Sequence, residues 1–89
     1  MDTATAFREF IEYVVGQLIQ HPDRASIAHQ LGDSETSHIF NVVVEPDDLG
    51  VVLGKNGQTV AAIRSILNAA ADRDGVSVAV NFVSRAELP

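Results

Sequence analysis

Two glycines, at positions 54 and 57, interrupt a stretch whose pattern otherwise predicts helix from residue 46 to residue 73. The segment Gly54-Lys55-Asn56-Gly57 therefore divides this stretch into two helices joined by a tight turn. Glycine adopts positive φ without strain and lets another backbone come close, because it has no side chain. The fold must accordingly place the ends of two helices next to each other, with a lysine in the turn between them. No other part of the sequence constrains the fold as strongly.

The residues before this loop predict one helix and a β-hairpin. Apolar side chains recur every three or four positions over residues 5–20, which indicates one face of an amphipathic helix. These residues are Phe7, Phe10, Ile11, Val14 and Leu18. Thr5 is the expected N-cap, and Pro22 ends the helix because the residue before a proline avoids the helical region.

Two strands are expected next, over residues 25–31 and 37–45, joined by a polar turn at 32–35. The first is the weaker prediction, with Ala25, Ile27 and Leu31 facing inward. In the second, apolar and polar positions alternate, which is typical of a half-buried strand. Its inward-facing residues are Phe40, Val42 and Val44.

Around the loop, the pattern predicts a short helix over residues 46–53, a longer one over 58–73 and a strand over 76–83. Proline and two aspartates suit the start of the short helix, where the dipole is positive. The buried stripe of the longer helix is expected to consist of Val60, Ile63, Leu67 and Ala70. The order is therefore α-β-β-α-α-β, an α+β domain with a three-stranded sheet and its helices on one face.

Length and composition fit one such domain spanning residues 1–89, with an ordered core of about 5–83 and short tails. The hydrophobic fraction of 46% indicates a folded core. Without cysteine, disulfides and zinc–thiolate sites are excluded. No apolar run is long enough to cross a membrane, and the N-terminus does not resemble a secretory signal peptide, so a cytoplasmic location is expected.

The loop has features that suit an anion. The first turn of the helix that follows it presents unpaired N–H groups at the positive end of a dipole. Lys55 lies inside the loop, where its ammonium group can meet a phosphate. A strand–helix–GxxG–helix unit that grips a short stretch of nucleic-acid backbone is the KH mode of recognition.

The segment resembles the KH signature. In that pattern an aliphatic residue precedes Gly-x-x-Gly, and a second aliphatic residue follows after two intervening residues. Here Leu53 and Val60 are the aliphatic residues, and residues 54–57 are the Gly-x-x-Gly. The wider run EPDDLGVVLGKNGQTVAAIRSILNAAA is similar to the small bacterial KhpA-type KH proteins, as is the helix ending in His21-Pro22-Asp23. The resemblance covers roughly residues 7–83 and implies a type II KH domain. It also implies a small cytoplasmic RNA-binding protein that pairs with itself or with a larger KH protein and affects cell division and envelope growth, with a role as an RNA chaperone in cell shape and cell wall biogenesis.

The resemblance assigns roles to individual residues. The backbone of single-stranded RNA would be gripped by the loop and its neighbours, namely Gly54, Lys55, Asn56, Gly57, Gln58 and Arg64. An apolar groove for the bases would be formed by Leu49, Val52, Leu53 and Val60. Leu53 and Val60 are expected to serve the core more than the groove.

Charge opposes this interpretation. Twelve acidic residues face six basic ones, which gives a net charge of −6. Relatives often carry basic residues where this chain has Val51, Gln58 and Ala61, so that only Lys55 and Arg64 remain near the loop. With one or two phosphate contacts, the salt slope for single-stranded RNA would be only about −0.7 to −1.4.

Catalytic and metal sites are not expected. A phosphate-binding NTPase loop needs four residues between its glycines, whereas Gly50 and Gly54 are separated by three. The three histidines, at 21, 29 and 38, lack the spacing of metal ligands on one helix. Asp47 and Asp48 are explained as acids at a helix start. No cofactor and no nucleophile are assigned.

The apolar stripe of the longer helix is wider than packing against the sheet requires. Ile66 is the residue expected to lie off the core face of that helix. It either completes the edge of the core or belongs to a dimer patch. The prediction is therefore non-catalytic binding of single-stranded RNA, with low sequence specificity and as a dimer. The alternative is a protein-interaction module that pairs with another KH protein, with RNA affinity supplied mainly by the partner. A simple structural turn remains a further explanation for the GxxG segment.

Overall fold

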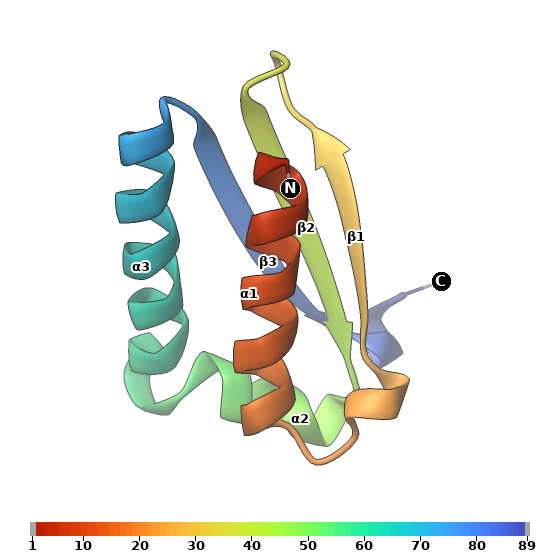
Figure 1. Ribbon diagram of the computed structural model, residues 1–89. Helices are drawn as coiled ribbons and strands as arrows, with labels where there is room; N and C mark the ends of the chain where they lie inside the picture. Colours follow the sequence, from red (N-terminus) through yellow and green to blue (C-terminus); the bar gives the residue numbers. More distant parts are fainter. Residues whose placement is uncertain (1, 89) are drawn as a thin grey trace.

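A mixed three-stranded sheet organises the computed structural model of the chain, which describes residues 2–88 (Figure 1). The elements follow in the predicted order: α1 (Thr3–Leu18), β1 (Ser26–Leu31), β2 (Ser37–Val44), α2 (Pro46–Leu53), α3 (Gln58–Asp74) and β3 (Ser77–Ser84). Short 3-10 turns lie at η1 (Pro22–Arg24), η2 (Lys55–Gly57) and η3 (Arg85–Glu87). Among the residues described, no helix has the length and apolar character needed to cross a membrane.

The sheet has the order β1-β2-β3, with β2 in the centre. β1 and β2 form the predicted antiparallel hairpin, in which His29 is opposite Phe40. β2 and β3 are parallel, with Phe40 opposite Val80. Parallel neighbours require a crossover connection, and α2, the GxxG loop and α3 provide it.

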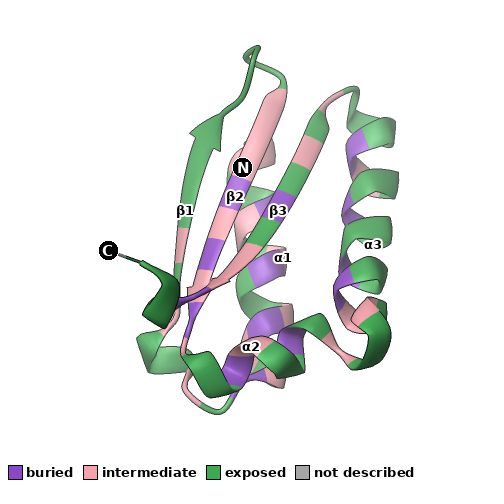
Figure 2. Ribbon diagram, turned by 180° about the vertical axis from the view of Figure 1, so that it is seen from behind, coloured by how far each residue is buried: buried purple, intermediate pink, exposed green. Residues whose placement is uncertain are grey.

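The helices pack on one face of the sheet, and the opposite face carries no helix (Figures 1 and 2). Alternation along β2 directs its apolar side chains into this interface, as predicted. The buried core consists of Phe7, Ile11, Val15, Phe40, Val42, Val44, Val52, Ile63, Leu67, Ala71 and Val80, with Ile19 at its margin. On α3, Ala71 is buried where the sequence favoured Ala70, which only packs against the core from the side.

The first helix begins earlier than predicted. Thr5 is not its N-cap; instead Asp2 occupies that position and its carboxylate accepts a hydrogen bond of 2.8 Å from the Thr5 main-chain N–H. An aspartate satisfies an unpaired donor of the first turn in this way. That hydrogen bond also holds the pKa of the Asp2 carboxyl below its ordinary value.

The two ends of the sheet also differ from expectation. Leu31 is 51% exposed rather than inward-packed, because the hairpin extends past the first turn of α1 (Figure 1). At the other end, Ser84 is not part of a tail: it is the last residue of β3 and is buried. Its hydroxyl accepts a hydrogen bond from Ala86 N at the start of η3, so the structured part of the chain continues beyond residue 83.

Candidate functional site

The GxxG loop is a tight turn in which three of the four residues depart from helical geometry. α2 ends at Gly54, whose φ is 78° and ψ is 172°. Asn56 has a φ of 56° and Gly57 one of 73°, both in the left-handed region. Such angles suit glycine, and asparagine is among the few other residues that adopt them readily. The sequence therefore supplies, at each of these positions, a residue that tolerates the turn.

Close packing adds a second requirement at Gly54. A side-chain carbon there would come within 2.7 Å of the main-chain nitrogen of Thr59, in the first turn of α3, and would also collide with its side chain. At Gly57 the same test finds open space. The first glycine thus lets the end of α2 pack directly against α3, whereas the second supplies only a backbone conformation.

The start of α3 is open to an anion. Gly57 is its N-cap and no side chain caps it, so the N–H groups of the first turn lack the usual side-chain acceptor. Lys55, Asn56 and Gln58 are all exposed beside it. Within residues 2–88, Lys55 takes part in none of the ion pairs. Main-chain donors, a helix dipole and one ammonium group therefore meet at one point of the surface.

The four residues expected to form the groove divide between core and surface. Val52 is fully buried and offers no surface to a base, which corrects its assignment. Val60 is only 7% exposed, and Leu49 packs at the side of the core. Leu53 is 36% exposed, and its neighbour Val51, which the sequence did not single out, is 43% exposed. The accessible apolar surface next to the loop is therefore formed mainly by α2's last turn.

Arg64 lies on α3, but its side chain bonds to β3 and not to the GxxG loop. Its Nε and Nη2 donate hydrogen bonds of 3.3 and 3.0 Å to the carbonyl oxygen of Val80 on β3. This contact lies at a cleft of about 270 Å³ between α3 and the edge strand, lined also by Leu67, Asn68 and residues 78–81. The sequence pattern of α3 contains no sign of this contact, because it depends on where β3 lies beside the helix.

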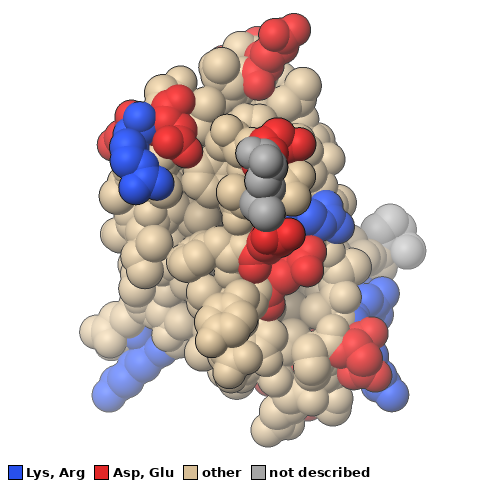
Figure 3. All heavy atoms as spheres, in the orientation of Figure 1, with Lys and Arg blue, Asp and Glu red and all other residues tan. Residues whose placement is uncertain are grey.

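Charged side chains are dispersed over the surface. Figure 3 shows Lys and Arg as separate patches near the margins of one face, with acids between them. Two of the arginines, Arg8 and Arg24, are paired with Glu12 and Glu45 at 3.1 and 3.5 Å. This face therefore presents no continuous basic stripe, and positive charge at the loop is local.

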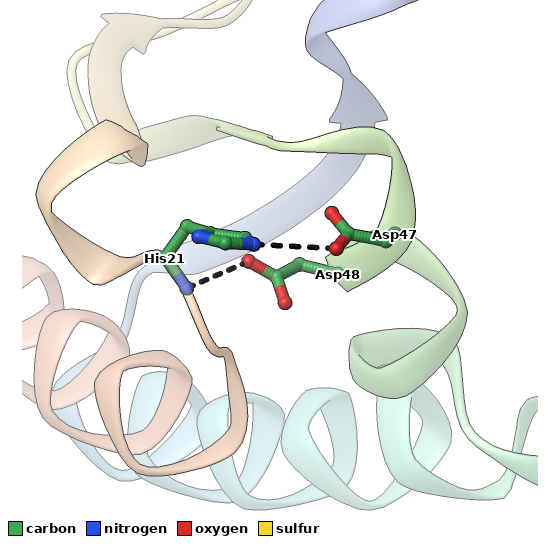
Figure 4. Close-up of side chains that lie close together, drawn as sticks. All are labelled: His21, Asp47 and Asp48. Atoms are coloured by element: carbon green, nitrogen blue, oxygen red, sulfur yellow. Dashed lines mark hydrogen bonds and ion pairs between the residues drawn. The ribbon is translucent and has the colours of Figure 1, made fainter.

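Another polar cluster joins His21 to the start of α2 (Figure 4). His21 Nε2 lies 3.2 Å from an oxygen of Asp47. Asp48 is fully buried, and its two oxygens accept hydrogen bonds of 2.9 and 3.0 Å from the main-chain N–H groups of Gln20 and His21. The preference for acids at a helix start therefore does not account for Asp48 fully. Its side chain connects the segment between α1 and β1 to the start of α2.

Ile66, on the same helix as Arg64, is 56% exposed. It lies off the core face, as the sequence predicts.

Comparison with known proteins finds one matching family and several relatives. The family model for the KhpA/KhpB KH domain matches residues 8–82, from α1 to β3. A protein named "RNA-binding protein KhpA" from Chlamydia muridarum is 32% identical over 76 residues, which cover 85% of this chain and 95% of the relative. Proteins of the same name from Clostridium perfringens and Streptomyces coelicolor are 33% and 36% identical over 76 and 70 residues, covering 85% and 79% of this chain and 99% and 85% of the relatives. No solved structure matches the chain at a significant level.

Proposed function

Because this chain belongs to the KhpA/KhpB family of KH domains, we propose that it binds single-stranded RNA, without catalysis, through the GxxG loop. The observation that carries the proposal is the loop itself: two glycines with positive φ bring exposed Lys55 to an uncapped helix start. Relatives of this chain are named as RNA-binding proteins and not as enzymes.

In the proposed mode, the RNA backbone passes over the loop and the bases lie against the neighbouring apolar surface. Main-chain N–H groups of the first turn of α3 bind a phosphate, with help from Lys55, Asn56 and Gln58. Leu53, with Leu49 behind it, supports a base, and Val51 extends that surface. Arg64 contributes from the cleft beside Val80.

Few charges take part, so this binding is expected to depend weakly on salt. One or two phosphate contacts give a slope of log affinity against log salt of about −0.7 to −1.4 for a single strand. The net charge of −6 repels RNA at long range. Affinity then rests on main-chain donors and base contacts, and sequence specificity is low.

We further propose that the protein acts in the cytoplasm as a dimer, with Ile66 in the interface, paired with itself or with a larger KH protein. An exposed isoleucine on an otherwise well-packed helix supports this, since such side chains gain free energy when a partner covers them. Following the family resemblance, we place the role of an RNA chaperone in cell division, cell shape and cell wall biogenesis.

A second function is favoured by the charge distribution. The chain has acids in excess, and Arg64, one of the two bases near the loop, already donates to Val80. In this alternative the domain is a protein-interaction module, and a basic partner supplies most of the RNA affinity.

The loop is tested by replacing Lys55 and Asn56 together with aspartate. We expect at least a tenfold loss of affinity for mixed-sequence single-stranded RNA, with unchanged circular dichroism and sedimentation. Arg73→Asp is the control, because it lies at the far end of α3, beside Asp74, and lowers the net charge by two, whereas the double variant lowers it by three. Equal losses in both variants would show that only overall charge matters and would refute the loop mechanism.

A further inference from the structure

We propose that His29 and His38 form a binding site for one late first-row divalent cation, such as Zn²⁺, on the β-hairpin. The two histidines were not expected to meet, since they are separated by eight residues on different elements. The site involves no residue of the GxxG loop, so this inference is independent of the proposed RNA binding.

Strand register brings the two side chains together. In the antiparallel pairing, His29 is opposite Phe40 and His38 is opposite Leu31. Residues two apart on a strand share a face, so both histidines project from the helix-covered face as diagonal neighbours. They lie near the N-terminal end of β2, away from its C-terminal end, which leads into α2 (Figure 1).

The imidazole nitrogens face each other directly. Nε2 of His29 lies 3.0 Å from Nδ1 of His38, and the two ring planes are inclined by 28° with their centroids 5.2 Å apart. Only one of these two nitrogens can carry a proton while that contact lasts, so the other presents a lone pair. The pair therefore already holds at least one nitrogen in the form that binds metals.

An aromatic side chain lies beside each ring. The ring of Phe40 lies 4.9 Å from that of His29, and Phe7 meets His38 edge-on at 6.5 Å. Phe7 and Phe40 are buried and belong to the core. A pair of ligands held in this way loses little conformational entropy when a cation binds.

The separation fits the distance between two ligands of one metal ion. Zn–N bonds of about 2.0–2.1 Å place two adjacent nitrogens about 2.8–3.4 Å apart for bond angles between 90° and 109°. The distance between the two nitrogens is therefore already suitable. The bound cation would lie to one side of the line that joins them, so both rings turn toward it. His29 is exposed, so water can complete the coordination sphere.

Charge near the hairpin is mixed. The turn between the strands carries Asp33 and Glu35, whereas Arg8 of α1 donates a hydrogen bond of 2.7 Å to the carbonyl oxygen of Ile27 and is paired with Glu12. Imidazole ligands select zinc, copper and nickel over magnesium, which prefers oxygen. We therefore expect the site to discriminate between Zn²⁺ and Mg²⁺.

The other group with suitable atoms, His21 with Asp47 and Asp48, is a poorer candidate. Its potential ligand atoms lie within 4.8 Å of one another. However, both oxygens of Asp48 already accept main-chain hydrogen bonds, and His21 is paired with Asp47. These contacts account for the cluster as a connection within the fold, and it serves here as the internal comparison.

The test is a calorimetric titration of the untagged 89-residue chain with Zn²⁺ at pH 7.5, with Mg²⁺ as the comparison ion. We expect one Zn²⁺ per chain, a rise in Tm at saturation, and no corresponding effect of Mg²⁺. His29→Asn and His38→Asn should each weaken Zn²⁺ binding by tenfold or more, whereas His21→Asn should leave it unchanged.

Imidazole NMR signals of the wild-type protein provide a readout that does not depend on the folding of any variant. The His29 and His38 ring resonances should shift on Zn²⁺ addition while those of His21 do not. The proposal is overturned if no Zn²⁺ binds, if Mg²⁺ has the same effect, or if the shifts and the mutational loss fall on His21 instead.

Discussion

The main-chain nitrogen of Thr59 lies 2.7 Å from the point that a side-chain carbon on Gly54 would occupy. This contact joins the end of α2 to the first turn of α3, and it explains why the two glycines of the loop are not equivalent. Both have positive φ, but only Gly54 is packed against backbone.

Replacing each glycine with alanine separates these two requirements. Gly54→Ala should lower the free energy of unfolding by about 2–5 kcal/mol, because an unfavourable backbone region and a steric clash add together. Gly57→Ala should cost only about 1–2 kcal/mol, for the left-handed conformation alone. Urea denaturation of both variants measures the difference, and equal losses would show that the Thr59 contact does not matter.

Asp48 is predicted to be the polar side chain on which folding depends most. Asp48→Ala leaves the main-chain N–H groups of Gln20 and His21 without their acceptor, which should cost about 2–5 kcal/mol. Asp48→Asn retains one acceptor oxygen and should cost less. Asp47→Asn is the control: Asp47 is exposed, and its pair with His21 should contribute about 1 kcal/mol or less. Equal sensitivity at positions 47 and 48 in urea denaturation would contradict this account.

Replacing Gly16 with alanine is expected to stabilise the fold. Gly16 lies inside α1, and a side-chain carbon added there meets nothing within 4 Å. Gly16→Ala should therefore raise the free energy of unfolding by about 0.5–1 kcal/mol, by restricting the unfolded chain. A lower thermal midpoint for this variant would contradict the open space found at this position.

Ile66→Glu tests the proposed dimer. The side chain is 56% exposed, so the substitution should leave the monomer fold intact. In sedimentation equilibrium the variant should shift toward monomer relative to the wild type, because a charge would be buried in the interface. A wild-type monomer, or an unchanged dimer in the variant, would remove Ile66 from the interface.

The sequence predicts a helix or strand well where its apolar residues recur at a single regular spacing. In β2 every second residue from Phe40 to Val44 is buried, as expected for its three inward positions. The start of α1 was misplaced because Asp2 and Thr5 are both good caps, and their hydrogen bond decides between them. Leu31 is on the helix-covered face, opposite His38, but it is exposed, because its burial depends on how far α1 reaches along the hairpin, which periodicity does not encode.

Functional contacts were predictable only where they are local in the sequence. The GxxG turn is visible as a motif because its geometry comes from consecutive residues. Two other contacts, His29 with His38 and Arg64 with Val80, depend on strand register and on the placement of β3 beside α3. Val52 was assigned to the groove because helix periodicity alone could not decide which side of α2 faces the core.

The most direct test of the central proposal is titration of the purified protein into a labelled, mixed-sequence single-stranded RNA at low and at moderate salt. The loop mechanism predicts binding in both conditions, with a shallow slope of about −0.7 to −1.4 in log affinity against log salt. Absence of binding even at low salt would contradict it and would favour the protein-interaction module, with RNA affinity supplied by a partner.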